Sequence, residues 1–263
     1  LKDIDEAKLE LRNMIIDKKF GDSSTKVVIE EFLDGIELSC FILTDGENYK
    51  VLPFAKDYKK IGEGDTGLNT GGMGAISPVP FLDDDFLSKI QNKIIKPTIT
   101  GIIKENMKYN GFVFIGLIKV DDEPYVIEYN VRMGDPETEV VFPRLKNDLV
   151  ELFYSMGTPK FSDIKLNISD NHAATVILVS GGYPESYEKG KTINGLNNLS
   201  QVSVFHAGTK KKNDSFVTSG GRVLAITSMG KNFELALENS YDQIKNIKFD
   251  GMNYRKDIGF DLL

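Results

Sequence analysis

The chain has 263 residues, 41% of them hydrophobic, enough for one large or two ordinary domains that each bury a core. The net charge is −7 and no basic block is longer than Lys210-Lys211-Lys212, which argues against a nucleic-acid surface but allows a local cationic pocket. No apolar run reaches the roughly 18 to 20 residues of a membrane span, and no signal-peptide pattern is present, so we expect a soluble, globular protein without a membrane partner. The single cysteine, Cys40, cannot form an intramolecular disulfide, which favours a reducing, cytoplasmic compartment.

The first fifth of the chain is predicted to be a helix followed by strands. Apolar residues recur at helical spacing from Asp5 to about Lys19, which indicates a surface helix. Residues 26–33 and 37–44 are rich in β-branched and aromatic residues and are separated by the turn signal Asp34-Gly35. A second turn signal at Asp45-Gly46 predicts a hairpin that returns through residues 49–52. The chain begins without a methionine, so we expect it to be a piece of a longer protein.

The junction at residues 30–37 is a candidate nucleotide site. A strand whose pairing stops presents bare backbone N–H and C=O groups, which are natural partners of an adenine edge; here these belong to Glu31 and Leu33. The carboxylate of Glu37, just past the turn, could accept hydrogen bonds from ribose hydroxyls. The alternative is a strand that ends in exposed acidic residues.

A glycine-rich segment follows at residues 62–74, with six glycines interleaved with polar residues. Such a segment does not build a core, and it lets backbone amides approach an anionic ligand closely. It matches neither the Walker A loop nor the dinucleotide-binding fingerprint. The alternative is a flexible surface loop.

The middle of the chain is predicted to be helical and then β-stranded. A long helix is expected from about Asp83 to Asn110, with a kink or a division into two helices at Pro97. A buried strand over 111–120 is expected to pair with the strand that begins at Tyr125, and a helix is expected over 143–153. The predicted buried stripe of the long helix consists of Phe86, Ile90, Ile94, Ile95, Ile99, Ile102 and Ile103.

The strand that begins at Tyr125 carries the most informative polar residues. Side chains alternate along a strand, so Glu128 and Asn130 are expected to point the same way, with their Cα atoms roughly 6.5 to 7 Å apart. A carboxylate and an amide oxygen suit Mg²⁺, which takes one or two protein ligands and completes its shell with water and phosphates. Arg132 could clamp a phosphate, and the turn at 134–136 brings Glu137 back to the same region. The alternative is a strand that ends in a solvated polar turn.

From about Lys160 the chain is predicted to form a second, smaller α+β domain. Short β-rich runs at 172–180, 202–205 and 222–227 are separated by glycine-containing turns, and a helix is expected over 232–247. The two histidines, His172 and His206, lie in strand positions and are interpreted as structural.

Three stretches taken together resemble the phosphoribosylamine-glycine ligase family of purine biosynthesis, whose members are also called glycinamide ribonucleotide synthetases. These are Val-Ile-Glu-Glu-Phe-Leu-Asp-Gly at 28–35, Asp-Thr-Gly-Leu-Asn-Thr-Gly-Gly-Met-Gly-Ala at 65–75, and the segment from Val126 to Thr138. Their order and spacing are specific, and the resemblance extends over essentially the whole chain. The tail resembles the family in Ser180-Gly181-Gly182-Tyr183-Pro184, Val204-Phe205-His206-Ala207-Gly208-Thr209, Ser219-Gly220-Gly221-Arg222-Val223-Leu224 and Tyr254-Arg255-Lys256-Asp257-Ile258-Gly259.

The resemblance implies an α+β ATP-grasp fold with an incomplete lid subdomain, followed by a small mixed α/β carboxy-terminal domain. Residues 1–35 would be the remnant of the lid subdomain with the adenine linker, 36–160 the metal- and substrate-binding subdomain, and 161–263 the carboxy-terminal domain. ATP and Mg²⁺ or Mn²⁺ would be the cofactors. Carried over by position, the sites would be Glu30, Glu31 and Leu33 for adenine, Glu37 for ribose, Glu128 and Asn130 for the metal, and Arg132, Asp65 and Asn69 as catalytic residues near the substrates and phosphates.

The reaction implied is ATP-dependent ligation of glycine to 5-phosphoribosylamine through a glycyl phosphate intermediate. It needs positioning and charge stabilisation rather than a histidine-centred triad or a thiol nucleophile, and the sequence suggests neither of those. The family's amino-terminal domain and glycine-rich lid loop do not precede Leu1, so we expect the missing amino-terminal part of the same enzyme as a partner and poor turnover by this chain alone. Two alternatives are a non-catalytic ATP-grasp nucleotide-binding module and another ATP-grasp carboxylate-amine ligase.

Overall fold

The computed structural model describes residues 3–262, which divide after Asp34 into two compact units. In the first unit, α1 (Ile4–Ile15) begins at Asp3, whose carboxylate accepts hydrogen bonds from the amides of Asp5 and Glu6. A 3₁₀ turn follows at Gly21–Thr25. The helix buries none of its side chains, as expected for the predicted surface helix. No helix within residues 3–262 combines the length and the hydropathy that a membrane crossing requires.

Residues 26–33 are extended but form no strand, so the predicted strand at this position is wrong. A strand is defined by hydrogen bonds to a neighbouring strand, and the described part of the first unit contains no other extended segment that pairs with it. The β-branched and aromatic side chains are consequently open to solvent, and Val28, Ile29 and Phe32 are each more than three-quarters exposed.

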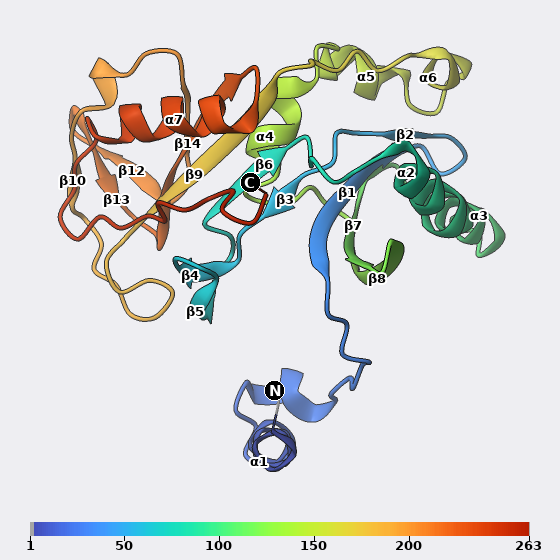
Figure 1. Cartoon of the computed structure of the whole chain (residues 1–263), viewed down its shortest axis with the longest axis horizontal. Coiled ribbons are helices and arrows are strands. Elements are labelled where there is room, and N and C mark those ends of the chain that lie inside the picture. Colours follow the sequence, from blue (N-terminus) through green and yellow to red (C-terminus); the bar gives the residue numbers. More distant parts are fainter. Residues whose placement is uncertain (1–2, 263) are drawn as a thin grey trace. The chain divides into compact units, whose positions relative to one another are not determined.

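The second unit, from Gly35 onward, begins with a four-stranded antiparallel sheet in the order β2-β1-β7-β8 (Figure 1). The strands and the hairpin predicted for these segments are confirmed. Hydrophobic residues on one face, among them Leu38, Cys40 and Ile115, form a core with the helices that follow β6. Cys40 is fully buried, which raises the pKa of its thiol. The strands are β1 (Ile36–Thr44), β2 (Tyr49–Val51), β7 (Gly111–Val120) and β8 (Glu123–Asn130).

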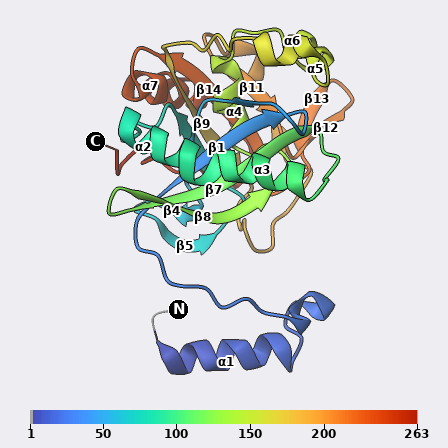
Figure 2. The ribbon, with the colours of Figure 1, turned by 90° about the vertical axis from the view of Figure 1, so that its right-hand side faces the viewer.

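One long helical segment covers this face of the sheet, as Figure 2 shows. It consists of α2 (Asp84–Ile90), a π turn (Gln91–Ile95) and α3 (Lys96–Lys104), and it ends six residues before the predicted limit. Pro97 lies in the first turn of α3, directly after the π turn, so the irregularity predicted at this proline takes the form of a widened turn. The predicted buried stripe holds except at Ile103, which is 52% exposed.

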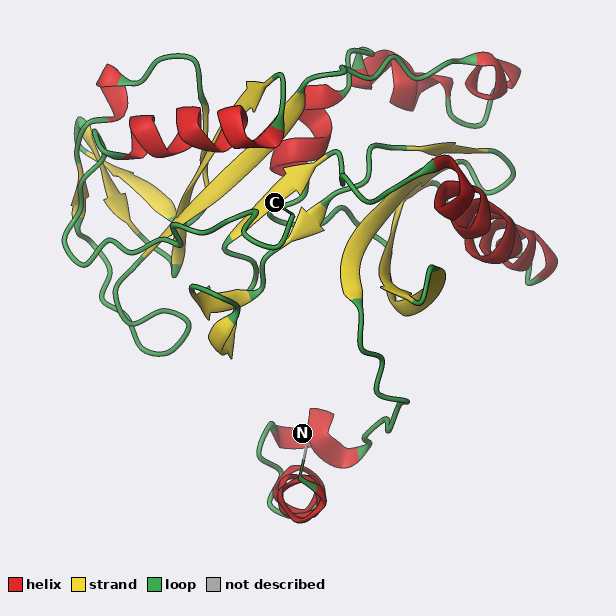
Figure 3. Ribbon diagram, in the orientation of Figure 1, coloured by secondary structure: helices red, strands yellow, loops and turns green. Residues whose placement is uncertain are grey.

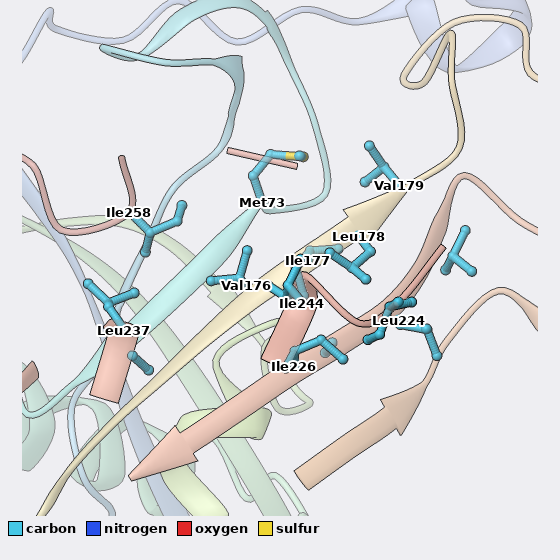
Figure 4. Packing of buried hydrophobic residues seen from close by; sticks show 14 of the residues in the cluster. Met73, Val176, Ile177, Leu178, Val179, Leu224, Ile226, Leu237, Ile244 and Ile258 are labelled. Atoms are coloured by element: carbon cyan, nitrogen blue, oxygen red, sulfur yellow. The ribbon is translucent and has the colours of Figure 1, made fainter. Parts of the chain in front are cut away.

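A five-stranded sheet in the order β11-β14-β9-β6-β3 forms the larger core (Figure 3). Helix α7 (Phe233–Ile244) packs on β9 and β14, and Figure 4 shows its Ile244 near Val176 and Ile226 of the sheet and its Leu237 near Ile258. The sheet draws strands from both sides of residue 160, because β6 pairs with β9 across about a hundred residues of chain. Its strands are β3 (Lys56–Asp57), β6 (Gly74–Ser77), β9 (His172–Val179), β11 (Ser203–His206) and β14 (Arg222–Gly230).

Smaller elements connect these sheets. The helix predicted over 143–153 is divided: a 3₁₀ turn at Phe142–Arg144 continues α4, and α5 starts only at Leu149, where Asp148 caps it. The two large sheets are joined where Ser39 of β1 exchanges backbone hydrogen bonds with Ala55. The remaining elements are β4 (Lys60–Gly62) with β5 (Thr66–Asn69), α4 (Thr138–Val141), α5 (Leu149–Ser155), α6 (Pro159–Asp163), a 3₁₀ turn at Leu196–Asn198, and the sheet β10 (Thr192–Ile193), β13 (Ser215–Thr218), β12 (Thr209–Lys212).

Candidate functional site

A β-bulge in β8 decides which way its polar residues point. Leu117 of β7 pairs with Val126, and Gly116 pairs with Glu128, so Ile127 is an extra residue without a partner. Paired residues of an antiparallel ladder share a face. Val126 packs into the core beneath the helices, and the hydroxyl of Tyr129 lies 2.9 Å from that of Thr98 on α3.

Glu128 and Asn130 flank Tyr129 and therefore lie together on the opposite face from α2 and α3. Glu128 lies against its partner Gly116, where a Cβ atom would come within 3.1 Å of the glutamate Cγ. A glycine at this place thus leaves the space that the carboxylate arm occupies. Alternation puts the two oxygen-bearing side chains on one face, as expected from the sequence, and the bulge turns that face away from α2 and α3.

Strand β1 contributes to the same face. Leu38, Cys40 and Ile42 point to the core under the helices, so Glu37 and Ser39 point to the other side. A cavity of about 340 Å³ opens beside Glu37. Its walls are formed by Gly35, Ile36, Glu37, Lys56, Asp57, Lys59, Lys60, Asp65, Asn69 and Asp261.

Charged groups of both signs meet around Lys59. Its ammonium forms an ion pair with the carboxylate of Glu37. Burial by itself would lower the pKa of Lys59. The negative charges of Asp57, Glu37 and Glu128 outweigh burial, so the pKa of Lys59 lies above its usual value. The ammonium thus pairs with the carboxylate predicted for ribose, and the charge of the carboxylate predicted for the metal also reaches it.

Glu137 returns to this face after the turn, as the sequence predicts. Its side chain is buried, and the hydroxyl of Ser39 donates a 2.9 Å hydrogen bond to Oε1. Burial, and then the negative charge of Asp57, raise the pKa of Glu137 to about 7. A Cβ atom on Gly134 would lie 2.4 Å from Oε2 of Glu137, so a side chain at this position would have to displace the carboxylate.

The glycine-rich segment is an ordered hairpin, β4-β5, followed by β6. Several of its amides donate within the protein, so the predicted open cradle of amides is wrong at these positions. Met73 is fully buried in the large core, contrary to the expectation that this segment builds no core. Three of these amides donate to side chains: Gly64 to Asp257 Oδ2, Gly71 to the Tyr183 hydroxyl and Gly72 to Thr70 Oγ1. Two donate to backbone carbonyl oxygens: Thr70 to Lys59 and Met73 to Tyr58.

Asp65 and Asn69 both line the cavity, from opposite ends of β5. The carboxylate of Asp65 is 2.5 Å from the guanidinium of Arg255, a buried residue that also forms two hydrogen bonds with Asp257. Arg255 further lies over the ring of Tyr58, 5.4 Å from its centroid. Asp65 is thus engaged in holding the hairpin to the carboxy-terminal segment, a role that the sequence did not indicate.

A second arginine missed at the sequence level, Arg222 of β14, joins the glycine-rich segment to the turn after β8. Its guanidinium donates to the carbonyl oxygens of Gly71 and Asp135 at 2.6 and 2.8 Å, and pairs with the carboxylate of Asp135 at 2.9 Å. Gly72 has φ +111°, and a Cβ atom there would lie 2.3 Å from Pro136 Cδ. The two segments that carry predicted site residues are therefore packed against each other.

The remaining predicted residues lie at the surface. Arg132 is exposed and donates to the carbonyl of Met133 at 2.9 Å and to Oδ1 of Asn130 at 3.5 Å. Glu30 and Glu31 are exposed and Leu33 is half-buried, in the extended segment of the first unit. Their part in nucleotide binding stays a prediction.

The donor set on β8 fits a hard divalent cation. Carboxylate and amide oxygens are the preferred ligands of Mg²⁺, and two protein ligands suffice when phosphates supply others. Nδ2 of Asn130 is buried without a hydrogen-bond partner in residues 3–262, so the amide is not locked by donation elsewhere. No group of three His, Cys, Asp or Glu side chains in the described residues could hold a metal by itself.

Comparison with known proteins identifies the family. The family model described as "Phosphoribosylglycinamide synthetase, ATP-grasp (A) domain" matches residues 1–138, more than half of the chain, and the corresponding C-domain model matches residues 173–261. The chain belongs to the phosphoribosylglycinamide synthetase family. The resemblance seen in the three sequence stretches is confirmed.

Individual members of the phosphoribosylglycinamide synthetase family are similar along nearly the whole chain. The chain is 42% identical over 258 residues to a phosphoribosylamine-glycine ligase of Chlorobaculum tepidum and 44% identical over 260 residues to that of Fusobacterium nucleatum, covering 97% of this chain and 61% of the relative in both comparisons. It is 43% identical over 256 residues to a bifunctional purine biosynthetic protein of Pichia angusta, covering 96% of this chain and 32% of that protein. The chain thus spans about three-fifths of the length of the first two relatives.

Solved structures confirm the α+β ATP-grasp fold followed by a carboxy-terminal domain. The crystal structure of phosphoribosylamine-glycine ligase from Thermotoga maritima superposes with a TM-score of 0.82 at 36% identity, covering 96% of this chain and 63% of that one. The biotin carboxylase domain of 2-oxoglutarate carboxylase from Hydrogenobacter thermophilus superposes with a TM-score of 0.67 at 14% identity, covering 95% and 53% of the two chains. The latter likeness concerns the fold alone.

Proposed function

We propose that this chain is part of an enzyme that ligates glycine to 5-phosphoribosylamine at the expense of ATP, giving glycinamide ribonucleotide, ADP and phosphate in purine biosynthesis. Membership of the family supports the reaction. The observation in the structure that carries the proposal is that Glu128 and Asn130 lie on the sheet face that also carries Glu37, which lines a cavity together with Lys59. That arrangement offers two oxygens for a cation next to room for a nucleotide.

Each predicted residue has a proposed role. Glu128 and Asn130 would hold Mg²⁺ or Mn²⁺, which when bound offsets the charge of the ATP phosphates. Glu37 would accept from the ribose hydroxyls, and Arg132, beside Asn130, would contact a phosphate through its planar guanidinium. Glu30, Glu31 and Leu33 would face adenine, and Asp65 and Asn69 would border the substrates.

The chemistry proposed for these groups is phosphoryl transfer followed by acyl transfer. The γ-phosphoryl group of ATP passes to a glycine carboxylate oxygen, which gives ADP and glycyl phosphate. The amine of phosphoribosylamine then attacks the carbonyl carbon, the bond from that carbon to the phosphate oxygen breaks, and the nitrogen loses a proton. Residues of this chain would act by positioning these groups and excluding water, since phosphoryl transfer depends mainly on alignment and electrostatics.

We also propose the division of labour expected from the sequence: residues 1–35 as part of a lid with the adenine linker, 36–160 as the metal- and substrate-binding subdomain, and 161–263 as the carboxy-terminal domain. The relatives are longer than this chain, and we propose that catalysis needs their additional amino-terminal segments as well. Glycinamide ribonucleotide formation by the 263-residue chain should therefore be weak or absent. Turnover at the rate of a full-length relative would refute this part of the proposal.

Calorimetric titration of the chain with ATP, with and without Mg²⁺, tests the site. We expect binding that depends on the cation, and we expect the variant Glu128→Ala/Asn130→Ala to lose that dependence while it keeps the thermal unfolding temperature of the original chain. Glu151→Ala/Asn147→Ala, a change of the same two residue types around α5, is the matched control. Equal ATP affinity with and without the cation would contradict the metal assignment and favour a nucleotide-binding module without chemistry.

A further inference from the structure

Lys59 occupies a place in the cavity that the proposed roles leave unexplained. It lies between β3 and β4, lines the cavity, and forms an ion pair with Glu37. The side chains of Lys59 and Glu37 are 45% and 44% exposed, respectively. An ion pair exposed to this extent contributes little to stability, because water and salt screen it and two long side chains must be ordered.

The nearby Lys56 shows what a fixed lysine looks like in the same cavity. Its side chain is only 7% exposed, its ammonium is 3.2 Å from the carboxylate of Asp261, and it lies 4.4 Å from the centroid of the Tyr58 ring. Lys56 is thus held by contacts on several sides. Lys59 has only the exposed contact with Glu37 among the ion pairs of the described residues, and its four-carbon stem is flexible.

Two of the carboxylates around Lys59, those of Glu37 and Glu128, are ones that a bound nucleotide and its cation would engage. Glu37 lies on one side of its ammonium, and Glu128 is near enough to raise the pKa of the lysine. A ribose hydroxyl donating to Glu37 would compete with the ammonium for the same oxygens. A divalent cation held by Glu128 would repel the ammonium and reduce the attraction of that carboxylate for it. Both events weaken the hold of Glu37 and Glu128 on Lys59, while the charge of Asp57 stays beside it.

We propose that Lys59 is an oxyanion-binding residue of this site, whose ammonium leaves Glu37 when the ligands bind and donates to an anionic oxygen of the ligand. The oxygen belongs either to a nucleotide phosphate or to the carboxylate of the amino-acid substrate. The inference rests on the proposed function. In the chain without ligands, the pair with Glu37 keeps the ammonium at the cavity wall and satisfies both charges.

Direct titration of three variants tests this proposal. Lys59→Met removes the charge, Lys59→Arg keeps it, and Lys160→Met removes a lysine that also forms an exposed ion pair, with Glu151, but lines no part of this cavity. The ligands are ATP with Mg²⁺, adenosine, which has no phosphates, and glycine in the presence of ADP and Mg²⁺. Thermal unfolding of each variant shows whether it is folded.

We expect Lys59→Met to weaken ATP binding about tenfold or more and to leave adenosine binding unchanged, because a charged hydrogen bond is lost only where phosphate is present. Lys59→Arg should retain most of the affinity, and Lys160→Met all of it. Unchanged ATP binding together with weakened glycine binding would support the same role with the carboxylate as the ligand.

Two results would overturn the proposal for Lys59 alone: unchanged binding of both ATP and glycine, or equal weakening of ATP and adenosine, which would indicate a structural effect on the whole cavity. A different result distinguishes failure of the proposed function. If the unaltered chain binds neither ATP nor adenosine, the nucleotide site itself is wrong, and the role of Lys59 is overturned with it.

Discussion

The hydroxyl of Ser39 donates a 2.9 Å hydrogen bond to the carboxylate of Glu137, a residue 98 positions further along the chain. Both side chains are buried, at 2% and 5% exposure. The bond connects β1 to the segment after β8 and so joins two of the segments that carry predicted site residues. A buried carboxylate needs such a partner, because leaving its oxygens without donors is costly.

Ser39→Ala is therefore expected to destabilise the chain by about 1 to 3 kcal/mol, since it leaves a buried carboxylate oxygen without its donor. Urea unfolding followed by circular dichroism measures the difference. Ser88→Ala, at an exposed position of α2, is the matched control and should change stability by no more than about 0.5 kcal/mol. Equal effects at the two positions would show that the bond to Glu137 has no special weight.

The raised pKa of Glu137 predicts a pH dependence of stability. The value rises from 4.5 to about 7 on folding, so between these limits the folded chain holds a proton that the unfolded chain has lost. The contribution of this group to stability is present below pH 4.5, falls as the pH rises, and is lost above pH 7, with a total of roughly 3 kcal/mol.

Glu137→Gln removes this titration and keeps the shape of the side chain. The free energy of unfolding of the variant, measured from pH 5 to 7.5, should fall less steeply with pH than that of the unaltered chain. Glu139 contributes a slope of the same sign, because burial, and then the charge of Asp135, also raise its pKa to about 7. Glu63→Gln, in the exposed turn of the β4-β5 hairpin, should retain the original slope. An identical slope in the Glu137 variant would rule out this carboxyl as its source.

Arg222 should hold the glycine-rich segment in place. Replacing it with Met removes its bonds to the carbonyl oxygens of Gly71 and Asp135 and leaves the carboxylate of Asp135 without its cation. We expect a loss of about 1 to 3 kcal/mol in stability and faster hydrogen exchange of amides in residues 70–73. Lys211→Met, on the exposed strand β12, should change neither quantity. Slow exchange in residues 70–73 of the Arg222 variant would show that other contacts fix the segment.

Two glycines should respond in opposite directions to replacement by alanine. Gly72→Ala is expected to destabilise the chain, because φ is +111° and the new Cβ atom would lie 2.3 Å from Pro136. Gly101→Ala lies in α3 with open space around the new atom and should stabilise the chain by about 0.5 to 1 kcal/mol. Thermal unfolding of both variants measures the difference, and a stable Gly72 variant would mean that the contact with Pro136 can yield.

Much of the local structure follows from the sequence because it depends on nearby residues. Alternating and β-branched residues predict β1, β7 and β8, and the turn at Asp45-Gly46 predicts the β1-β2 hairpin. Residues 26–33 have the same composition but no pairing strand in the described part of their unit, so the same rule fails there. Strand propensity describes a residue's fitness for a sheet and not the presence of one.

The parts of the site that the sequence did not reveal depend on distant contacts. Arg255 reaches Asp65 across 190 positions, and Arg222 reaches Asp135 across 87. Both arginines lie in stretches that resemble the family, yet their partners could not be read from spacing. The sequence suggested that the amides of the glycine-rich segment could bind an anion. It could not show that acceptors from distant parts of the chain, such as the Tyr183 hydroxyl, already accept hydrogen bonds from them.

The unpaired Ile127 has a consequence for how relatives of this chain are compared. Counting residues from Val126 in strict alternation would assign Glu128 and Asn130 to the underside of the helices, whereas their ladder partners Gly116 and Phe114 assign them to the cavity side. A relative one residue shorter at this point could therefore present the same two predicted ligands on the same face of the sheet. Residues of β8 in two such chains correspond when they pair with the same residues of β7. A sequence alignment that ignores the bulge would place Glu128 and Asn130 opposite the wrong residues of the relative.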